Sequence, residues 1–372
     1  MEYRFFRKIG DIPRYIERRR TYNNYKTINA EKKDVIDKVI WTDKQLSEYN
    51  TFWKKNYGYI PNVGFNKYFE SINGIYNYQY VARPLYDCVI EPRMNPYYYS
   101  FVLSQKNLQN SLFRCIEGLK VPDTYASCSG GIYVIDNTIL NFTDFVRKGG
   151  NIGECLIKPT LWTSSGNKVR VVNIRNGADA ITNESFNSIV KSYGKDFVIQ
   201  ELIAPSKELK AISLKSLNTF RVTTFIFNGE IYCSPVAFRI GLGDAITDNE
   251  CTGGYAIGVT NDGKLTKTAY NYESSADFLY LDRHPDTGIV FKDYYVADIE
   301  KVKWYAKKMH SLIPDLGICS WDLSVNDKDE VTFIELNTDY QGTDMNQVTT
   351  GEALFGELTG KVINQFYKSR KI

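Results

Sequence analysis

The chain of 372 residues is long enough for two or three lobes, each with its own hydrophobic core. Its 43% hydrophobic and 24% charged residues are typical of a soluble globular protein, and no run of about 18 apolar residues predicts a membrane span. The seven scattered cysteines contain no CxxC pair, which argues against a disulfide framework or a structural zinc site. The first 20 residues lack the apolar core of a secretory signal, and we expect a cytoplasmic protein.

The first 55 residues predict helices that carry excess positive charge. Apolar residues recur every three or four positions among 14 Lys/Arg and 8 Asp/Glu, and Thr42 or Asp43 can cap a second helix. The basic face is either an ordinary solvated surface or a contact for an anionic membrane surface or substrate. A packing arm in a homodimer is a further alternative. No zinc-finger, RRM-like or KH-like pattern is present, so we expect no nucleic acid partner.

The segment 51–150 predicts a change from irregular chain to short regular elements. Residues 51–100 are rich in Tyr, Phe, Asn, Gly and Pro and predict an irregular connection with short elements, packed by aromatic residues. A helix is expected from Ser104 to the Gly118 stop. Short strands within 121–140, with a turn at Asp136-Asn137, and a helix over 142–148 should follow.

Beyond Gly149-Gly150 the sequence becomes rich in strands. Asn228-Gly229 predicts a hairpin turn, and Asn261-Asp262-Gly263 predicts another. Helices are expected at 183–192 and 296–312. The expected strands, rich in β-branched and aromatic residues, cover 154–160, 169–174, 197–203, 219–240, 253–260, 319–326 and 331–336. The fold class is therefore α+β, with antiparallel sheets flanked by helices.

Two carboxylates and an amide fall on neighbouring strands near the C-terminus. Asp322 belongs to one predicted strand, and Glu335 and Asn337 belong to the next. Residues two apart on a strand face the same side, so Glu335 and Asn337 project together, and pairing of the strands can bring Asp322 beside them. Oxygen ligands of this kind suit Mg²⁺ that bridges phosphates. The three residues are candidate magnesium ligands, and the alternative is that they are solvated acids at strand ends.

Two further elements have the pattern of a nucleotide site. Lys158 ends a predicted buried strand, and the small residues of the following loop, 163–166, leave backbone N–H groups open to phosphates. The strand 197–203 carries Gln200-Glu201 near its end and is followed by Glu208. This second pattern indicates an adenine hinge with an acid for the ribose hydroxyls.

The order of these elements resembles the ATP-grasp superfamily, and most of residues 40–365 resembles its branch associated with sugar transfer and bacterial cell-surface polysaccharide. The resemblance is carried by the segments 105–113, 217–224, 239–259 and 343–356. It implies an ATP-grasp fold, with two α+β lobes clasping ATP, after a helical, aromatic-rich N-terminal region. The implied domains are the N-terminal region at 1–100, a preceding subdomain at 101–150, the N-lobe at 151–205 and the C-lobe at 206–372.

The resemblance also implies a role for each matching residue, with ATP and Mg²⁺ as cofactors. The ATP-binding set is Lys106, Lys158, Ser165, Gly166, Gln200, Glu201, Leu202, Ile203 and Glu208. The metal ligands are Asp322, Glu335 and Asn337, and the acceptor side is lined by Asp248, Asn249, Gly253 and Gly254. Arg221 and Arg239 are the candidate catalytic residues, for the γ-phosphate and an acyl phosphate. Each of these arginines has the alternative of an ion pair on the sheet surface.

The chain departs from the superfamily at two positions. Many ATP-grasp ligases have an arginine two residues before the first metal acid or two after the asparagine, where this chain has Ser320 and Asp339. Either Arg221 or Arg239 then supplies the missing arginine, or the chemistry differs from simple ligation. The implied function is a carboxylate–amine ligase that releases ADP and phosphate. The implied substrates are a uronic acid or amino acid as the carboxylate and an amine, either free or linked to a sugar or lipid. A kinase of a sugar or amino-acid precursor is the alternative, and a non-catalytic nucleotide-binding module is the third.

Overall fold

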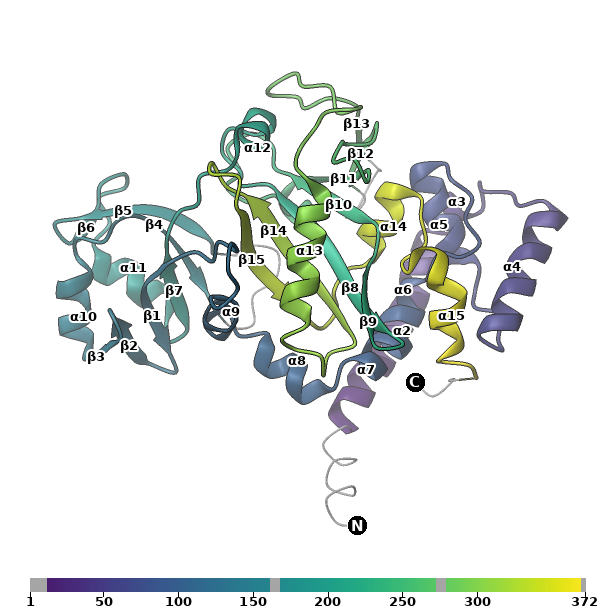
Figure 1. The fold of residues 1–372 in the computed structure, drawn as a ribbon, viewed down its shortest axis with the longest axis horizontal. Coiled ribbons are helices and arrows are strands. Elements are labelled where there is room, and N and C mark those ends of the chain that lie inside the picture. The colour runs from purple at the N-terminus through teal and green to yellow at the C-terminus, as the bar shows by residue number, and fades with distance from the viewer. Residues whose placement is uncertain (1–11, 161–167, 272–278, 369–372) are drawn as a thin grey trace, which may run out of the picture.

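The computed structural model describes residues 12–160, 168–271 and 279–368, and arranges them around two antiparallel sheets (Figure 1). The seven-stranded sheet lies at one end of the molecule, the eight-stranded sheet at the centre, and the helices of the N-terminal region at the other end. In the described ranges, no helix combines the length and apolar character that crossing a membrane requires. The expected α+β class, with its helical, aromatic-rich N-terminal region, is confirmed.

The N-terminal region consists of short helices, which are α2 (Ile12–Glu31), α3 (Lys33–Ile36), α4 (Asp43–Asn56), α5 (Gly64–Asn73), α6 (Arg83–Leu85), the π-helix η1 (Tyr86–Ile90), α7 (Glu91–Met94) and α8 (Tyr97–Leu103). Thr42 caps α4 in a capping box with Gln45, as its sequence predicts. The predicted aromatic packing and short elements over 51–100 are present, and the structure shows that these elements are helices. Phe65, Phe69 and Ile72 are buried on one face of α5, and this tertiary packing supports a helix of poor intrinsic propensity.

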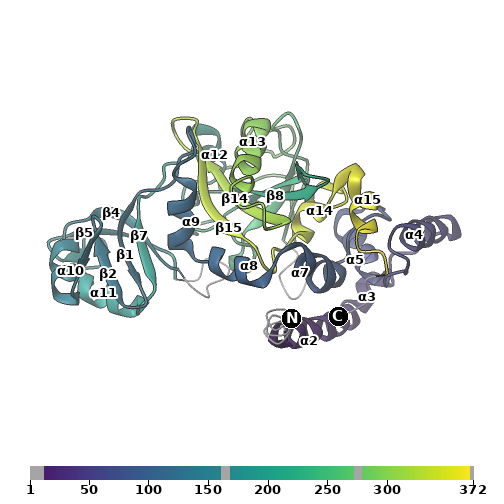
Figure 2. The ribbon, with the colours of Figure 1, turned by 60° about the horizontal axis from the view of Figure 1, so that its bottom comes forward.

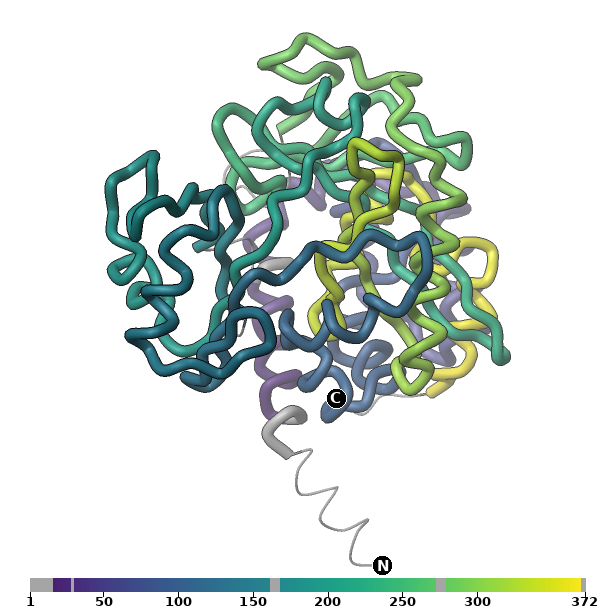
Figure 3. The backbone as a smooth tube through the Cα atoms, turned by 60° about the vertical axis from the view of Figure 1, so that its left-hand side comes forward, coloured from purple at the N-terminus to yellow at the C-terminus, as the bar shows by residue number. Residues whose placement is uncertain are grey.

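The seven-stranded sheet is built from the middle of the chain. Its strands are β1 (Thr124–Ser129), β2 (Ile132–Ile135), β3 (Thr138–Leu140), β4 (Gly153–Pro159), β5 (Arg170–Arg175), β6 (Ala178–Asp179) and β7 (Phe197–Gln200), in the order β3-β2-β1-β7-β4-β5-β6. Helices α10 (Phe142–Gly149) and α11 (Phe186–Tyr193) cover it. Asp136 and Asn137 both have positive φ, which confirms the predicted turn. Figure 3 shows this sheet and its helices as a lobe beside the rest of the chain. The lobe contains strands from both sides of residue 150, where the sequence-based division separates the preceding subdomain from the N-lobe. That division into domains stays a prediction.

The eight-stranded sheet carries most of the C-terminal half. Its strands are β8 (Thr219–Phe227), β9 (Glu230–Cys233), β10 (Val236–Ile240), β11 (Tyr255–Val259), β12 (Ala269–Asn271), β13 (Leu279–Leu281), β14 (Ile318–Val325) and β15 (Val331–Asn337). The order is β13-β12-β11-β10-β8-β14-β15, with β9 paired to β8 through the predicted Asn228-Gly229 turn. The short helices α12 (Lys207–Ile212) and η2 (Glu250–Thr252) and the helix α13 (Ile299–His310) complete this part.

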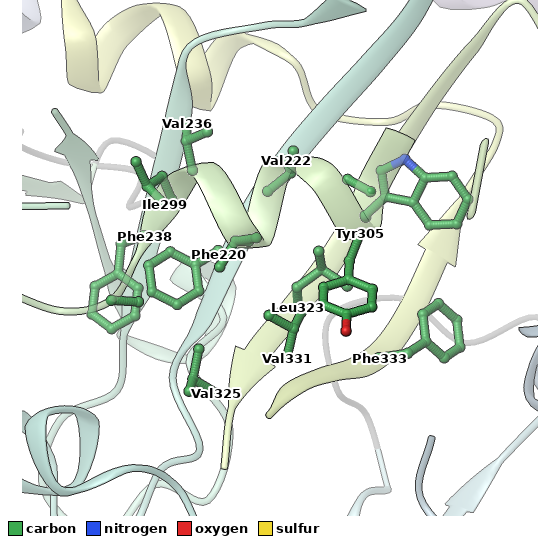
Figure 4. Packing of buried hydrophobic residues seen from close by; sticks show 14 of the residues in the cluster. Phe220, Val222, Val236, Phe238, Ile299, Tyr305, Leu323, Val325, Val331 and Phe333 are labelled. Atoms are coloured by element: carbon green, nitrogen blue, oxygen red, sulfur yellow. The ribbon is translucent and has the colours of Figure 1, made fainter. Parts of the chain in front are cut away.

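One face of the eight-stranded sheet forms the main hydrophobic core (Figure 4). Helix α13 lies across this face, and Val222, Leu323 and Phe333 point toward it from three adjacent strands. Helix α9 (Lys106–Phe113) adds Phe113, whose ring is 5.4 Å from that of Trp321. α9 is shorter than the predicted 104–118 helix. Because successive residues of a strand face opposite sides, this packing turns Arg221, Asp322 and their polar neighbours to the other face.

The C-terminal segment returns to the N-terminal region. It forms α14 (Asp344–Thr350), the 3-10 helix η3 (Gly356–Leu358) and α15 (Thr359–Asn364). Trp53 of α4 shares a buried cluster with Ile363 of α15, and Phe69 of α5 shares another with Val348 of α14. The N-terminal helices are therefore part of the same packed body as the second sheet.

Candidate functional site

The predicted metal residues meet on the polar face of the second sheet. β14 and β15 pair so that Asp322 is opposite Glu335 and Ser320 is opposite Asn337, with an irregularity in the register after Asp322. On its other side, Asp322 is opposite Arg221 of β8. The amide of Asn337 lies 3.4 Å from Asp322 Oδ2. The sequence-based prediction that these three side chains converge is consistent with this pairing.

Two arginines hold the Asp322 carboxylate. Arg221 Nε lies 2.6 Å from Asp322 Oδ1, and Arg239 Nη2 lies 2.9 Å from Asp322 Oδ2. All three side chains are buried. Burial alone would raise the pKa of Asp322, but the two guanidinium groups hold it below its usual value. Both arginines therefore form ion pairs on the polar face of the sheet, as the alternative interpretation of each expected. Their partner is Asp322, a predicted metal ligand, so these ion pairs lie within the candidate site.

Two lysines approach Glu335 from other elements. Lys106, the first residue of α9, places Nζ 3.2 Å from Glu335 Oε1. Lys158 extends from the end of β4 in the seven-stranded sheet, so the two sheets meet here. Burial and the charge of Lys106 together lower the pKa of Lys158 from its usual value to about 8, against the opposing effect of Glu335. Lysines of this kind can bind an anion, and the carboxylates beside them can bind a cation that accompanies it.

A cavity of about 750 Å³ opens between these groups. Lining it are the predicted residues Lys106, Lys158, Arg221, Arg239, Asp248, Asn249, Asp322, Glu335 and Asn337. The apolar residues Leu156, Leu217, Ile334 and Leu336 also contribute, together with backbone and hydroxyl groups. Residues from segments that are far apart in the sequence thus share one space, large enough for a nucleotide.

Some predicted ATP-binding residues lie elsewhere. Gln200, Glu201, Leu202, Ile203 and Glu208 do not line this cavity among the described residues. Gln200 is buried in the sheet between β1 and β4, and Glu201 pairs with Lys120 at 2.6 Å. Their nucleotide role stays a prediction. Ser165 and Gly166, predicted to cover the phosphates, lie outside the described residues.

The predicted acceptor side is tied to Arg239. The guanidinium donates to Asn249 Oδ1 at 3.1 Å and lies 3.6 Å from Asp248, which in turn accepts from the Thr219 hydroxyl at 2.6 Å. Gly253 and Gly254 follow η2 and do not line the cavity among the described residues. Gly254 contacts the backbone of the 248–249 segment, since its N–H donates to the Asn249 carbonyl oxygen at 2.9 Å.

Gly254 packs so closely that a side chain would displace this segment. An added Cβ would lie 2.4 Å from the Asp248 carbonyl oxygen and 2.8 Å from that of Asn249. We therefore expect Gly254→Ala to lower the free energy of unfolding by about 1–3 kcal/mol, measured by urea denaturation. Cys251→Ala, in the exposed part of the same turn, is the control and should change it by less than about 0.5 kcal/mol. Equal stability of the two variants would contradict the close packing.

Several cavity residues were not identified from the sequence. They come from the N-terminal helices, from the loop after β15 and from the start of α14, and include Glu17, Arg83, Tyr97, Phe101, Tyr340 and Asp344. Arg83 lies 3.5 Å from Asp344 across more than 250 residues of chain. The sequence pattern gives no local signal for such a contact. It does show that Asp344 is a polar residue close after the predicted metal strand.

The donor set fits a hard cation bound with phosphates. Asp322, Glu335 and Asn337 offer carboxylate and amide oxygens on one wall of the cavity, which is the chemistry that Mg²⁺ prefers. Among the described residues, no group of three or more His, Cys, Asp and Glu gathers as a protein-only metal site. Magnesium that keeps few protein ligands and takes the rest from phosphates and water is compatible with this set.

The chain belongs to the sugar-transfer associated ATP-grasp family, which matches residues 89–362. This match confirms the resemblance inferred from the motifs and, with the two sheets, the ATP-grasp fold. Among curated proteins no relative matches the chain.

Comparison with solved structures gives matches of low sequence identity. The D-Ala:D-Ser ligase VanG from Enterococcus faecalis matches with 14% identity and a TM-score of 0.40, over 71% of this chain and 62% of that one. The ATP-grasp ligase PsnB, complexed with minimal precursor, Mg and ADP, matches with 14% identity and a TM-score of 0.38, over 76% and 62%. An ADP complex of PurK, N5-carboxyaminoimidazole ribonucleotide synthetase, matches with 12% identity and a TM-score of 0.35, over 64% and 45%. The chain thus covers less than two thirds of the length of these proteins.

Proposed function

We propose that the protein is a Mg-ATP-dependent carboxylate–amine ligase that forms an amide through an acyl phosphate. The observation that carries this proposal is the single cavity in which Lys106, Lys158, Glu335, Asp322 and the two arginines meet. Membership of the sugar-transfer associated family supports a role in bacterial cell-surface polysaccharide biosynthesis. We infer that the carboxylate is a uronic acid or an amino acid.

The chemistry has two steps that need no protein nucleophile. A carboxylate oxygen of the substrate attacks the γ-phosphorus of ATP, and the bond from that phosphorus to the β,γ-bridging oxygen breaks, which releases ADP. The amine nitrogen then attacks the acyl carbon, the acyl C–O bond to phosphate breaks, and the amine loses a proton. Bound magnesium supplies positive charge to the phosphates.

The residues of the cavity would meet these demands in turn. Lys106 and Lys158 would hold the phosphates, and Asp322, Glu335 and Asn337 would hold magnesium. Arg221 and Arg239 would stabilise the negative charge that grows on the transferred phosphoryl group and on the acyl phosphate. Asp248 and Asn249, bonded to Arg239, would face the acceptor. The ion pairs of the ligand-free site, such as Lys106 with Glu335, would exchange for contacts to phosphate and cation.

Product analysis tests the proposal. The purified protein is incubated with Mg-ATP and a panel of uronic acids and amino acids, and nucleotides, phosphate and amide products are measured by chromatography and mass spectrometry. We expect ADP, phosphate and an amide in equal amounts, and none of them with Lys158→Met. Lys168→Met, at the foot of the next strand, should retain turnover. Formation of AMP and pyrophosphate would overturn the proposal, and a stable phosphorylated product would identify a kinase instead.

Membrane contact through the basic N-terminus, homodimer formation and a cytoplasmic location stay predictions. The charge excess of residues 1–55 lies partly in residues 1–11, outside the described ranges. Helix α2, however, lines the cavity with Glu17 and buries Arg18, and its net charge does not predict either contact.

A further inference from the structure

Helix α2 contributes to the wall of the cavity, although it precedes the segment that matches the family. The match begins at residue 89, and α2 ends at Glu31. Figure 2 shows α2 alongside the short helices that precede the first sheet, and it packs against α6 and η1. Glu17 of α2 lines the cavity. Its neighbour Arg18 is 3% exposed, whereas Arg19 and Arg20 face solvent.

Arg18 is surrounded by groups that fit a guanidinium. Its Nη2 lies 3.0 Å from Glu91 Oε2 and also pairs with Asp339, while Nη1 donates to the Asp87 carbonyl oxygen. The guanidinium carbon lies 3.8 Å from the centre of the Tyr340 ring. Burial would lower the pKa of Arg18, but the carboxylates of Glu91 and Asp339 hold it above its usual value. A permanently charged, planar side chain therefore joins α2 to α7 and to the loop after β15.

The loop after β15 is fixed by the same carboxylate. Glu91 is fully buried, and its two oxygens accept from the backbone N–H groups of Tyr340 and Gln341 at 3.0 and 3.2 Å. The carbonyl oxygen of Gln341 then accepts from Arg221 Nη1 at 2.6 Å. Arg221 binds Asp322 with its Nε at 2.6 Å. A continuous line of buried contacts thus runs from Arg18 through Glu91 and the loop to Arg221.

We propose that Arg18 is a positioning residue: by holding Glu91 and the 339–341 loop, it fixes the carbonyl group that orients Arg221 in the cavity. The role of Arg221 in this inference rests on the proposed function, whereas the hold of Arg18 on the loop does not. Part of the basic N-terminal segment accordingly serves the active site rather than a solvated face. Arg19 and Arg20, one and two positions along, lack these contacts among those described and supply the matched controls.

Hydrogen exchange measures the hold of Arg18 on the loop in the full chain. Arg18→Lys keeps the charge but loses the planar fork, and Arg18→Met with Glu91→Gln removes both charges so that neither is left buried alone. In both variants, peptides covering 338–345 should exchange on the order of tenfold faster than in the wild type. Arg19→Met and Arg20→Met should leave these peptides unchanged. Unchanged exchange in the folded Arg18→Lys protein would overturn the proposal, whatever reaction the enzyme catalyses.

Turnover and binding measure the consequence for Arg221. For Arg18→Lys we expect ATP turnover to fall on the order of tenfold to a hundredfold, because small displacements of a catalytic group are costly. The dissociation constant of Mg-ATP should change less than about threefold, since Lys106 and Lys158 are untouched. In an Arg221→Lys background, the same change at Arg18 should cause no further loss. Additive losses would show that Arg18 acts only on general stability. Absence of turnover in the wild type would refute the proposed function but leave the exchange result decisive.

Discussion

Asp322→Ala is expected to lower the free energy of unfolding by about 3–5 kcal/mol, which is the largest stability effect among the cavity residues. The substitution leaves Arg221 and Arg239 in a buried site without the carboxylate that holds them at 2.6 and 2.9 Å. Two guanidinium groups then repel each other in a largely buried place, where screening by water is weaker than at the surface. Urea denaturation followed by tryptophan fluorescence measures the change, because Trp321 is the neighbouring residue and is fully buried.

Glu335→Ala is the matched control, since it removes the second carboxylate of the same proposed metal site. The Glu335 side chain is 28% exposed, and its ion pair with Lys106 spans 3.2 Å. Partly exposed pairs of this kind contribute about 0–1 kcal/mol, so the variant should fold almost normally. Both variants should lose Mg-dependent turnover. Equal stability losses in the two would contradict the assignment of Asp322 as the anchor of the two arginines.

The sequence predicts the strands and the helices of residues 12–56 well, and the helices between residues 64 and 103 less completely. Strands such as β8 and β14 consist of β-branched and aromatic residues bounded by clear turns, and Asn228-Gly229 defines a hairpin by local chemistry alone. The segment around α5 contains Asn, Gly and aromatic residues, which have low helix propensity. Its helix depends on burial against α14, a contact made by residues more than 250 positions away. Such tertiary packing does not produce a local sequence pattern, so the low helix propensity of these residues hides the helix from sequence-based prediction.

The candidate site divides in the same way. Asp322, Glu335 and Asn337 are predictable because strand periodicity and one short turn bring them together. Lys158 has a weaker local signal, the end of a buried strand before a loop of small residues, whereas Lys106 and the two arginines require the resemblance to a known family. Arg18 is beyond both approaches. Its partners Glu91 and Asp339 are 73 and 321 residues away, and α2 precedes the matched segment. In the sequence it is one of several similar arginines.

The affinity for Mg-ATP is expected to fall as the pH rises above about 8, by about tenfold for each further pH unit. Burial and the neighbouring Lys106 lower the pKa of Lys158 from 10.5 to about 8 in the ligand-free protein, against the opposing effect of Glu335. Below pH 8 the Lys158 side chain is a charged ammonium group, which can bind phosphate without taking up a proton. Above pH 8 the free protein holds a neutral amine, while the triphosphate favours the charged form, so binding must take up a proton. Because binding takes up a proton, the affinity falls as the pH rises.

Titration calorimetry at pH 7, 8 and 9, in buffers of different ionisation enthalpy, measures both the affinity and the proton uptake. Lys158→Arg is the test variant, because a guanidinium stays charged over this range. We expect it to bind Mg-ATP with little dependence on pH and without proton uptake. Lys148→Arg, an exposed change on α10, should retain the pH dependence of the wild type. If Lys158→Arg also kept that dependence, another group would be responsible, and Lys158 would not be the lysine that meets the phosphates.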